Sequence, residues 1–204
     1  MKLHDGIAAL GLDLPAGSED RLMAFLALMV KWNRAYNLTS VTREAEMVTH
    51  HLLDSLSLLP HLGSVKTLAD IGSGAGLPGL VLALVRPDLA LTSVETVGKK
   101  VAFQQQAKIE FRLGNVTVHG GRVEAFHPAT GFDAVVSRAF ASLADFVALA
   151  GHLAAPGGRL LAMKGVLPED EIAALPAGWR VVDTPRLTVP GLDAQRHLII
   201  LERA

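Results

Sequence analysis

The hydrophobic pattern of the chain changes after the first third of its length. In the segment SEDRLMAFLALMVKWNRAYNL, residues 18–38, apolar side chains recur three or four positions apart, which predicts an amphipathic helix with Ser18 as its N-cap. The segment TREAEMVTHHLLDSLSLLPHLG, residues 42–63, predicts one or two further helices. We therefore expect a helical extension over residues 1–62, followed by one compact domain over residues 63–204.

In that second part, short apolar runs alternate with longer amphipathic segments. The apolar runs predict strands at residues 66–72, 89–96, 115–121, 132–139 and 159–165. The longer segments predict helices at residues 78–87, 98–114 and 142–158, the second closed by Gly114 and the third by Pro156 and Gly157. Two more strands around a Pro/Gly loop are expected within residues 179–203. Because strands that alternate with helices pair in parallel, we expect an α/β sheet.

Composition limits the function classes that remain. Half of the 204 residues are hydrophobic, enough for a full core, and the formal net charge of −1 argues weakly against a nucleic-acid binder. Cysteine is absent, which excludes disulfides, thiolate metal sites and cysteine nucleophiles. The histidines lack the spacing of metal ligands, so no metal is expected. Without a membrane-length apolar run or a secretory pattern at the acidic N-terminus, we expect a cytoplasmic protein with no membrane contact.

The segment LADIGSGAGLPG, residues 68–79, is rich in glycine directly after the first predicted strand. Ligands of parallel α/β sheets bind at the carboxyl ends of the strands, and glycine lets the backbone approach a ligand closely. Residues 74–79 also match the dinucleotide pattern G-x-G-x-x-G, and Glu95 lies 21 residues after Gly74. Pro78 weakens that interpretation, because it removes a backbone donor that a pyrophosphate needs. A P-loop is excluded, because no Gly-Lys-Ser/Thr follows.

S-adenosylmethionine fits the same residues without a phosphate cradle. Asp70 would place a negative charge near the ammonium or sulfonium group, and Glu95 would accept both ribose hydroxyls. Backbone groups of Val123 and Glu124, in the segment GRVEAF after the third strand, would meet the adenine. A tight strand-to-helix turn without any ligand remains the alternative interpretation of the glycine loop.

Basic residues follow the predicted strands at the same edge of the sheet. Arg138 comes after the fourth strand and can fork onto a carboxylate or a phosphate, or form an internal ion pair with Asp70 or Glu124. Lys164 ends the fifth strand, and the other cations expected near this edge are Lys99, Lys100 and Arg122. Such a basic rim would allow a protein of nearly neutral charge to bind RNA.

Two further residues are candidates for contacts with RNA. Asn37 follows the first long helix, where a polar residue more often ends a helix than binds a substrate. Phe140 could stack on an exposed base, or it could pack beneath the sheet. Both interpretations stay open for each residue.

The motifs together resemble those of a known family. NLTSVT, HHLLDSLSLLP, DIGSGAGLPGLVLALVRP, GKKVAFQQQ, GRVEAF, SRAFASL and LLAMKG occur in this order, as in the bacterial glucose-inhibited division protein B family of class I S-adenosylmethionine-dependent methyltransferases. The resemblance covers roughly residues 20–200 and implies a Rossmann-like, seven-stranded, mostly parallel sheet with a C-terminal antiparallel hairpin. It also implies methyl transfer to N7 of one guanine, guanine 527, in 16S ribosomal RNA of the small subunit or its precursor.

The resemblance also assigns roles to single residues. Gly72 and Leu77 match cofactor-contacting positions of the glycine loop, and Val123 and Glu124 match the pair that meets the adenine. Arg138 matches an arginine near the cofactor and the substrate, which makes it a candidate for positioning.

The absence of motifs for other methylation reactions agrees with the expected chemistry. Methylation of a pyrimidine carbon usually needs a cysteine, and methylation of the adenine amino group usually needs an Asn/Asp-Pro-Pro-aromatic motif, where this chain has Ser137-Arg138-Ala139-Phe140. Guanine N7 has a free lone pair, so the enzyme only has to align it with the methyl group, and no catalytic base is assigned. Glu95 stands where the family often has Asp, but the carboxylate remains.

Three alternatives stay open. The chain could methylate a small molecule or a protein, act as a nicotinamide-dependent oxidoreductase, or bind RNA without catalysis. The oxidoreductase would need a catalytic Tyr-Lys pair, but Tyr36 is the only tyrosine and it precedes the predicted sheet. N7 is hard to reach in an A-form helix, so we expect an open loop or an assembly intermediate as the target, and a monomeric enzyme.

Overall fold

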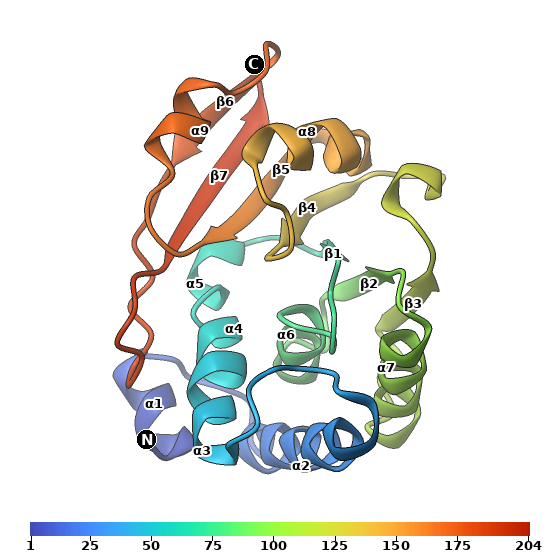
Figure 1. Ribbon diagram of the computed structural model, residues 1–204, viewed down its shortest axis with the longest axis vertical. Helices are drawn as coiled ribbons and strands as arrows, with labels where there is room; N and C mark the ends of the chain where they lie inside the picture. Colours follow the sequence, from blue (N-terminus) through green and yellow to red (C-terminus); the bar gives the residue numbers. More distant parts are fainter.

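Seven strands form one sheet in the order β3-β2-β1-β4-β5-β7-β6 (Figure 1). The computed structural model describes all 204 residues. The strands are β1 (Thr67–Ile71), β2 (Ala90–Glu95), β3 (Val116–Gly120), β4 (Phe132–Ser137), β5 (Ala154–Lys164), β6 (Trp179–Asp183) and β7 (His197–Arg203). The strands β1 to β5 pair in parallel, whereas β7 runs antiparallel to both β5 and β6. The predicted mostly parallel sheet with a C-terminal antiparallel hairpin is confirmed.

The helices fall into an N-terminal group and a group that alternates with the strands. The N-terminal group is α1 (Leu3–Ala9), α2 (Ser18–Tyr36), α3 (Glu44–Met47), the π-helix η1 (Val48–Leu53), α4 (Asp54–Leu56) and α5 (Leu59–Leu62). The second group is α6 (Gly79–Val85), α7 (Gly98–Glu110), α8 (Leu143–Ala150), α9 (Glu169–Ala173) and the short 3-10 helices η2 (Val123–Ala125) and η3 (Gly151–Leu153). The sequence prediction contains no helix at α9 or at η2. None of these helices combines the length and the apolar composition that crossing a membrane requires.

The two faces of the sheet carry different covers. The helices α6 and α7 pack on one face, with α2 and α4 packed against them, while α8 covers the other face (Figure 1). The cluster of 38 buried hydrophobic residues joins the N-terminal helices to α6, α7 and the sheet, whereas the face under α8 has a cluster of only 16. Hydrophobic packing therefore crosses the boundary between residues 62 and 63 without interruption. The division into an extension and a domain at that boundary stays a prediction.

The end of α7 differs from the prediction. The helix ends at Glu110 rather than at Gly114. Arg112 adopts the left-handed conformation, with φ of 51°, which normally falls to glycine. The next residue, Leu113, turns into the core and is 3% exposed. Burial of this leucine therefore decides where the helix stops.

Two other predicted boundaries are also wrong. The N-cap of α2 is Gly17, in the left-handed conformation with φ of 79°, and Ser18 is the buried first residue of the helix. Pro156 and Gly157 do not end a helix but lie inside β5, which begins at Ala154. A register shift where β5 pairs with the start of β4 accommodates these two residues.

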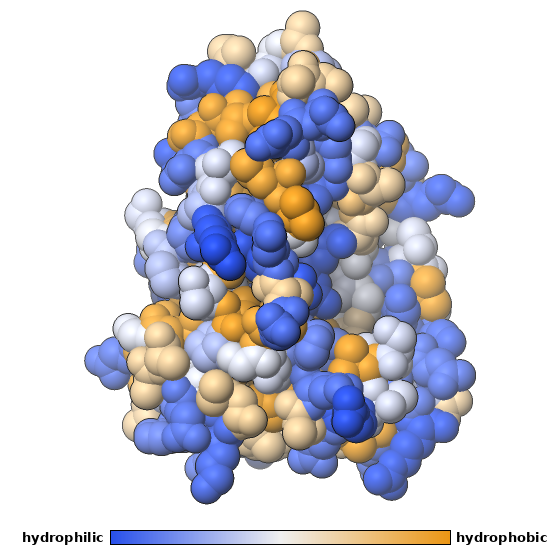
Figure 2. All heavy atoms as spheres, turned by 60° about the vertical axis from the view of Figure 1, so that its left-hand side comes forward, coloured by the Kyte–Doolittle hydropathy of each residue, from blue (hydrophilic) through white to orange (hydrophobic).

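The strand order places two loops side by side at the carboxyl edge of the sheet. The strand β1 pairs with β2 on one side and with β4 on the other, so the order of the strands reverses between β1 and β4. Ligands of open α/β sheets bind outside such a switch point. In the space-filling view of Figure 2, hydrophilic residues surround a recess between the upper and lower parts of the molecule.

Candidate functional site

The loop between β1 and α6 depends on its glycines. Gly72, Gly74 and Gly76 have φ of 64°, 59° and 79°, in the left-handed region that glycine adopts readily. A Cβ atom on Gly76 would lie 2.4 Å from Cδ1 of Leu80, and one on Gly72 would lie 2.7 Å from Cβ of Ala139. Larger residues at these two positions would therefore force neighbouring atoms to move.

Most backbone N–H groups of this loop already donate inside the protein. The residues whose N–H groups do so are Gly72, Ser73, Gly74, Gly76, Leu77 and Gly79. A pyrophosphate at the start of a helix needs such donors free, and Pro78 has no N–H at all. The geometry therefore argues against the nicotinamide dinucleotide alternative.

A buried network of polar side chains holds the loop. Nε2 of Gln104, on α7, donates to Oγ of Ser73 and to the carbonyl oxygen of Gly74, each at 2.8 Å. Oγ of Ser93, on β2, lies 2.6 Å from Oγ of Ser73 and donates to Oε1 of Gln104. Because all three side chains are buried and hydrogen-bonded, the loop is fixed to both β2 and α7. The sequence analysis missed this network, although a glutamine on the apolar face of an amphipathic helix was a signal for it.

Asp70 lies at the end of β1 and is fully buried. Its Oδ2 accepts the N–H of Gly79 at 2.7 Å, whereas its Oδ1 is buried without a hydrogen-bond partner. Burial raises the pKa of this carboxyl to about 7, and the Gly79 hydrogen bond opposes the shift. The contact of Asp70 with a cationic group of the cofactor stays a prediction, and Oδ1 is the atom available for it.

Glu95 ends β2 and supports the loop through backbone contacts. Its Oε2 accepts the N–H of Gly74 at 2.7 Å, and its Oε1 accepts the N–H groups of the two following residues. Oε2 keeps a second lone pair for a further donor such as a ribose hydroxyl. Val123 is buried and Glu124 is exposed, both in η2, which follows β3. The contacts of these three residues with the ribose and the adenine stay predictions.

The loop forms one wall of a cavity of about 230 Å³, which we call the glycine-loop cavity. Its lining residues are Leu38, Thr39, His51, Gly72, Ser73, Gly74, Ala75, Leu77, Lys100, Arg138 and Ala139. The structure thus brings together five residues that the sequence analysis singled out, from three separate segments. Asp70 and Glu95 are not part of this lining, although both accept a hydrogen bond from the loop or its helix.

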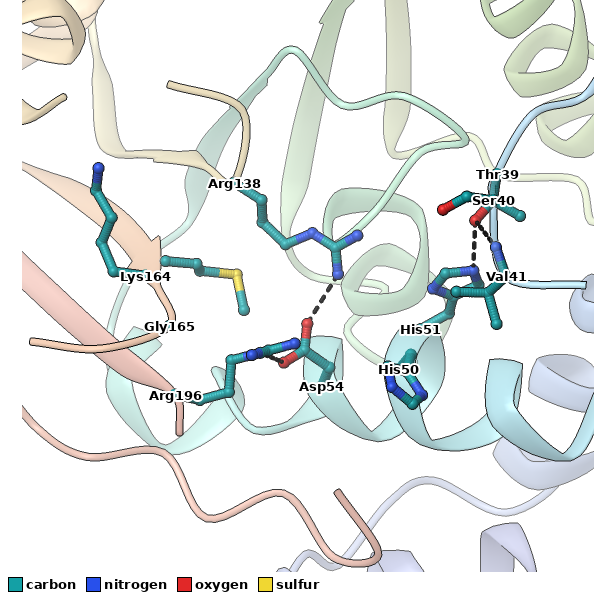
Figure 3. A pocket seen from close by; sticks show the side chains of 11 residues that line it. Thr39, Ser40, Val41, His50, His51, Asp54, Arg138, Lys164, Gly165 and Arg196 are labelled. Atoms are coloured by element: carbon teal, nitrogen blue, oxygen red, sulfur yellow. Dashed lines mark hydrogen bonds and ion pairs between the residues drawn. The ribbon is translucent and has the colours of Figure 1, made fainter. Parts of the chain in front are cut away.

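A second cavity of about 360 Å³ adjoins the first, and we call it the arginine cavity (Figure 3). It shares Thr39, His51 and Arg138 with the glycine-loop cavity. Its other lining residues are Ser40, Val41, His50, Asp54, Met163, Lys164, Gly165 and Arg196. Two ligands bound in the two cavities would therefore meet at the three shared side chains.

One buried carboxylate holds two arginines in the arginine cavity. Oδ2 of Asp54 accepts a hydrogen bond from Arg138 at 2.8 Å, and its Oδ1 accepts one from Nε of Arg196 at 3.0 Å. Figure 3 shows Asp54 between the two guanidinium groups. Arg138 therefore forms an internal ion pair, one of the two interpretations left open, but the partners named for it, Asp70 and Glu124, are wrong, because the N-terminal helices bring Asp54 to this arginine instead.

The sequence analysis missed Asp54 and Arg196. For Asp54 a signal existed, because a lone acid within the apolar run HHLLDSLSLLP has to find a partner if the run is buried. For Arg196 no signal existed, because the residue lies in a loop before β7 and only the folded chain brings it to Asp54.

His51 lies on the wall between the two cavities. Its Nε2 is 3.0 Å from Oγ1 of Thr39, and its Nδ1 is buried without a partner. Burial lowers the pKa of His51 to about 4, so the ring is neutral at neutral pH. The neighbouring His50 bonds through its ring to the carbonyl oxygen of Glu46, and no group of three metal-ligating side chains occurs in the chain. The π-helix η1 carries both histidines, and such helices often mark functional sites.

Two of the predicted RNA contacts are engaged inside the protein. Nζ of Lys164 donates to both carboxylate oxygens of Glu171, at 3.1 and 2.9 Å, and its side chain is 13% exposed. In Figure 3 it extends away from Asp54. Phe140 stacks on Phe146, with ring centroids 5.0 Å apart, against the core beneath α8. Contacts of Lys164 and Phe140 with RNA stay predictions.

The other three predicted RNA contacts are more accessible. Asn37 is the C-cap of α2 and adopts the left-handed conformation with φ of 49°, as a polar residue at a helix end does. Lys99 is exposed in the first turn of α7, and Lys100 lines the glycine-loop cavity. No ligand contact of these residues has been tested, so their roles stay predictions.

Comparison with known proteins decides the family. The family model GidB, described as rRNA small subunit methyltransferase G, matches residues 18–199. The chain belongs to this family. A ribosomal RNA small subunit methyltransferase G from Aromatoleum aromaticum is 62% identical over 98% of this chain and 97% of the relative. One from Azoarcus sp. is 60% identical over 99% of this chain and 95% of the relative.

Solved structures share the fold at low sequence identity. The O-methyltransferase TomG from Streptomyces achromogenes, in complex with SAM, matches with a TM-score of 0.58 and 16% identity, covering 88% of this chain and 89% of that one. The family, the Rossmann-like fold and the enzyme class predicted from the sequence are confirmed by these comparisons.

Proposed function

We propose that this GidB-family methyltransferase transfers a methyl group from S-adenosylmethionine to N7 of a guanine in 16S ribosomal RNA. The observation that carries the proposal is the wall of Thr39, His51 and Arg138 between a cavity built on the glycine loop and a second, cationic cavity. The near relatives are named as methyltransferases of small-subunit ribosomal RNA, which supports the same substrate class. The position within the RNA, guanine 527, is part of the proposal.

The glycine-loop cavity suits the methionine end of the cofactor. Small loop residues leave room for the backbone to approach a zwitterionic amino acid, and the nearby carboxyl of Asp70 has one oxygen, Oδ1, without a hydrogen-bond partner. Glu95 has a free lone pair on Oε2 for a ribose hydroxyl. The cofactor supplies an electrophilic methyl group on a positively charged sulfur. His51, neutral at neutral pH, adds no positive charge beside that group.

The acceptor needs orientation more than activation. N7 of guanine attacks with its lone pair, the methyl–sulfur bond breaks, and the positive charge moves from sulfur to the guanine ring, so no proton has to be removed. Alignment of two held reactants can supply a large part of the rate enhancement. The wall residues Thr39, His51 and Arg138 lie where such alignment would be set. Arg138 is accordingly assigned as a positioning residue.

The proposal also covers the binding partners, the cellular location and the oligomeric state of the protein. We assign the RNA contacts outside the two cavities to Asn37, Lys99 and the other basic-rim residues, with the small ribosomal subunit or its precursor as the substrate particle. A ribosomal substrate in bacteria places the enzyme in the cytoplasm. We also propose that it acts as a monomer, which light scattering at assay concentrations would test.

The experiment is a methyl-transfer assay with product identification. The protein is incubated with methyl-labelled S-adenosylmethionine and with small subunits that lack their own modification at the target, and the RNA is digested to nucleosides. Label in 7-methylguanosine is the expected result. Measured cofactor binding without label in RNA would contradict the proposed acceptor and turn attention to small molecules and proteins.

A further inference from the structure

The pairing of Asp54 with two arginines joins three distant parts of the chain. Asp54 comes from α4, whereas Arg138 and Arg196 lie 84 and 142 residues further along, after β4 and before β7. The Asp54 side chain is 3% exposed, while those of Arg138 and Arg196 are 29% and 26% exposed. The carboxylate is therefore hidden, whereas both arginine side chains stay partly exposed.

The charges in this cavity do not balance. Two guanidinium groups share one carboxylate, which leaves one positive charge in excess. Lys164 does not change this excess, because Glu171 neutralises it. His51 is neutral, and the remaining lining residues carry no acidic group. The arginine cavity is therefore suited to an anion.

Both arginines also keep hydrogen-bond donors free. A guanidinium has five N–H groups. Arg138 uses NH1 on Asp54, and Arg196 uses Nε on Asp54 and NH1 on the carbonyl oxygen of Gln195. The remaining N–H groups can form the forked contact that arginine makes with the oxygen atoms of a phosphate.

We propose that Arg138 and Arg196 together bind one backbone phosphate of the RNA beside the target guanine, and that Asp54 is the positioning residue that fixes both guanidinium groups. This inference rests on the proposed function, because the RNA supplies the phosphate. A phosphate held in the arginine cavity would place its nucleotide against the wall of Thr39, His51 and Arg138. Asp54 prevents the two guanidinium groups from separating by mutual repulsion and ties the N-terminal helices to the site.

The first test compares Arg196→Gln with Arg112→Gln. Arg112 is exposed, its side chain makes no hydrogen bond or ion pair, and it follows α7 at the opposite edge of the sheet, so its substitution removes the same charge away from the site. Binding of unmodified small subunits is measured with S-adenosylhomocysteine present, between about 50 and 200 mM salt. Affinity for S-adenosylmethionine is measured separately by calorimetry.

For Arg196→Gln we expect affinity for the subunit to fall about tenfold or more. The slope of log affinity against log salt should become shallower by about 0.7–0.9, the loss of one phosphate contact. Affinity for S-adenosylmethionine should stay at the wild-type value, and Arg112→Gln should match the wild type in both assays. Unchanged subunit binding would overturn the proposal. Weaker binding with an unchanged salt slope would also overturn it, because the arginine would then contact a neutral base atom.

The second test concerns the positioning role of Asp54. Asp54→Asn keeps both arginine charges, so its salt slope should not fall, but turnover at saturating subunit should decrease because the guanidinium groups are no longer fixed. A normal turnover in folded Asp54→Asn protein would contradict the positioning role. If this variant does not fold, Arg196→Gln still decides the phosphate contact. Wild-type protein that binds subunits but transfers no methyl group would refute the proposed function without affecting the salt-slope comparison.

Discussion

The two adjoining cavities are built in opposite ways. Five of the residues that line the glycine-loop cavity come from one short stretch, residues 72–77. This stretch forms hydrogen bonds with neighbouring strands and helices. The arginine cavity takes Asp54, Arg138 and Arg196 from three segments that are far apart in the sequence and that meet at Asp54. The side assigned to the methyl donor is therefore encoded locally, and the side assigned to the RNA is encoded by the tertiary fold.

The two cavities also differ in how their polar groups are stabilised. The groups that hold the glycine loop are mostly neutral and fully buried, as in the network of Ser73, Ser93 and Gln104. The arginine cavity depends on ionic groups, of which only the carboxylate is buried. Changes on the first side should therefore act through packing and backbone conformation, and changes on the second through charge.

The largest effect should come from removing the shared carboxylate. Asp54→Ala leaves Arg138 and Arg196 without their buried partner, and we expect the free energy of unfolding to fall by about 3 kcal/mol, near the low end for a broken buried pair because the arginines reach solvent. Urea unfolding followed by circular dichroism measures this. As a control, Asp193→Ala removes an exposed acidic side chain from the loop before β7 that also carries Arg196. This substitution should change the free energy of unfolding by less than about 0.5 kcal/mol. Equal effects of the two substitutions would show that Asp54 does not hold the segments together.

A smaller effect is expected from the glycine loop itself. Gly76→Ala forces a Cβ atom to 2.4 Å from Leu80 at a positive φ, so we expect a loss of about 1–3 kcal/mol in stability and weaker binding of S-adenosylmethionine. Gly114→Ala is the matched control, because its Cβ atom would meet no other atom within 4 Å. Thermal unfolding and calorimetric titration measure the two quantities. If folded Gly76→Ala protein bound S-adenosylmethionine as tightly as the wild type does, the glycine loop would not take part in cofactor binding.

The buried network beneath the loop should contribute a similar amount to stability. Gln104→Leu removes the bonds to Ser73 and to the Gly74 carbonyl, and we expect a loss of about 1–3 kcal/mol in stability with a weaker affinity for S-adenosylmethionine. Gln105→Leu, one position further along α7 and exposed, should leave cofactor affinity unchanged. Equal cofactor affinity in the two variants would mean that the network does not shape the loop.

A pH dependence of stability is also expected at Asp70. Its pKa is raised from 3.8 to about 7 in the folded protein, so between these values the fold keeps a proton that the unfolded chain has lost. Stability from this group therefore falls as the pH rises from about 4 to about 7. Asp70→Asn keeps an oxygen acceptor for the Gly79 N–H but cannot titrate. The stability of this variant relative to the wild type should rise between pH 5 and pH 8, in urea unfolding at each pH, and a constant difference would contradict the assignment.

The sequence predicted the sheet because its signals are local. Short apolar runs bounded by glycine and proline mark β1 to β4, and the alternation with helices implies parallel pairing. The ends of elements were less predictable, because they depend on burial: Leu113 decides the end of α7, and a register shift next to β4 draws Pro156 and Gly157 into β5. The π-helix η1 has no local signal at all.

The residues of the candidate site also differ in whether a local sequence pattern reveals them. Gly72, Gly74 and Leu77 could be found from one segment, and the structure brings them to one cavity. Arg138 was found as a candidate, but its partner was not, because no sequence pattern joins residues 84 positions apart. A single sequence therefore identifies the glycine loop, whereas the charged cavity becomes visible only in the folded chain.

Two variants together test whether the two cavities bind different ligands. Gly74→Ala adds a methyl group whose nearest neighbour is Nζ of Lys100 at 3.9 Å, so the fold has room for it, although φ is positive there. Arg196→Gln removes one charge from the other cavity. Dissociation constants for S-adenosylmethionine and for unmodified small subunits are measured for both. We expect Gly74→Ala to weaken binding of the cofactor alone and Arg196→Gln to weaken binding of the subunit alone. A variant that weakens binding of both ligands equally, or of the opposite ligand, would contradict separate roles for the two cavities.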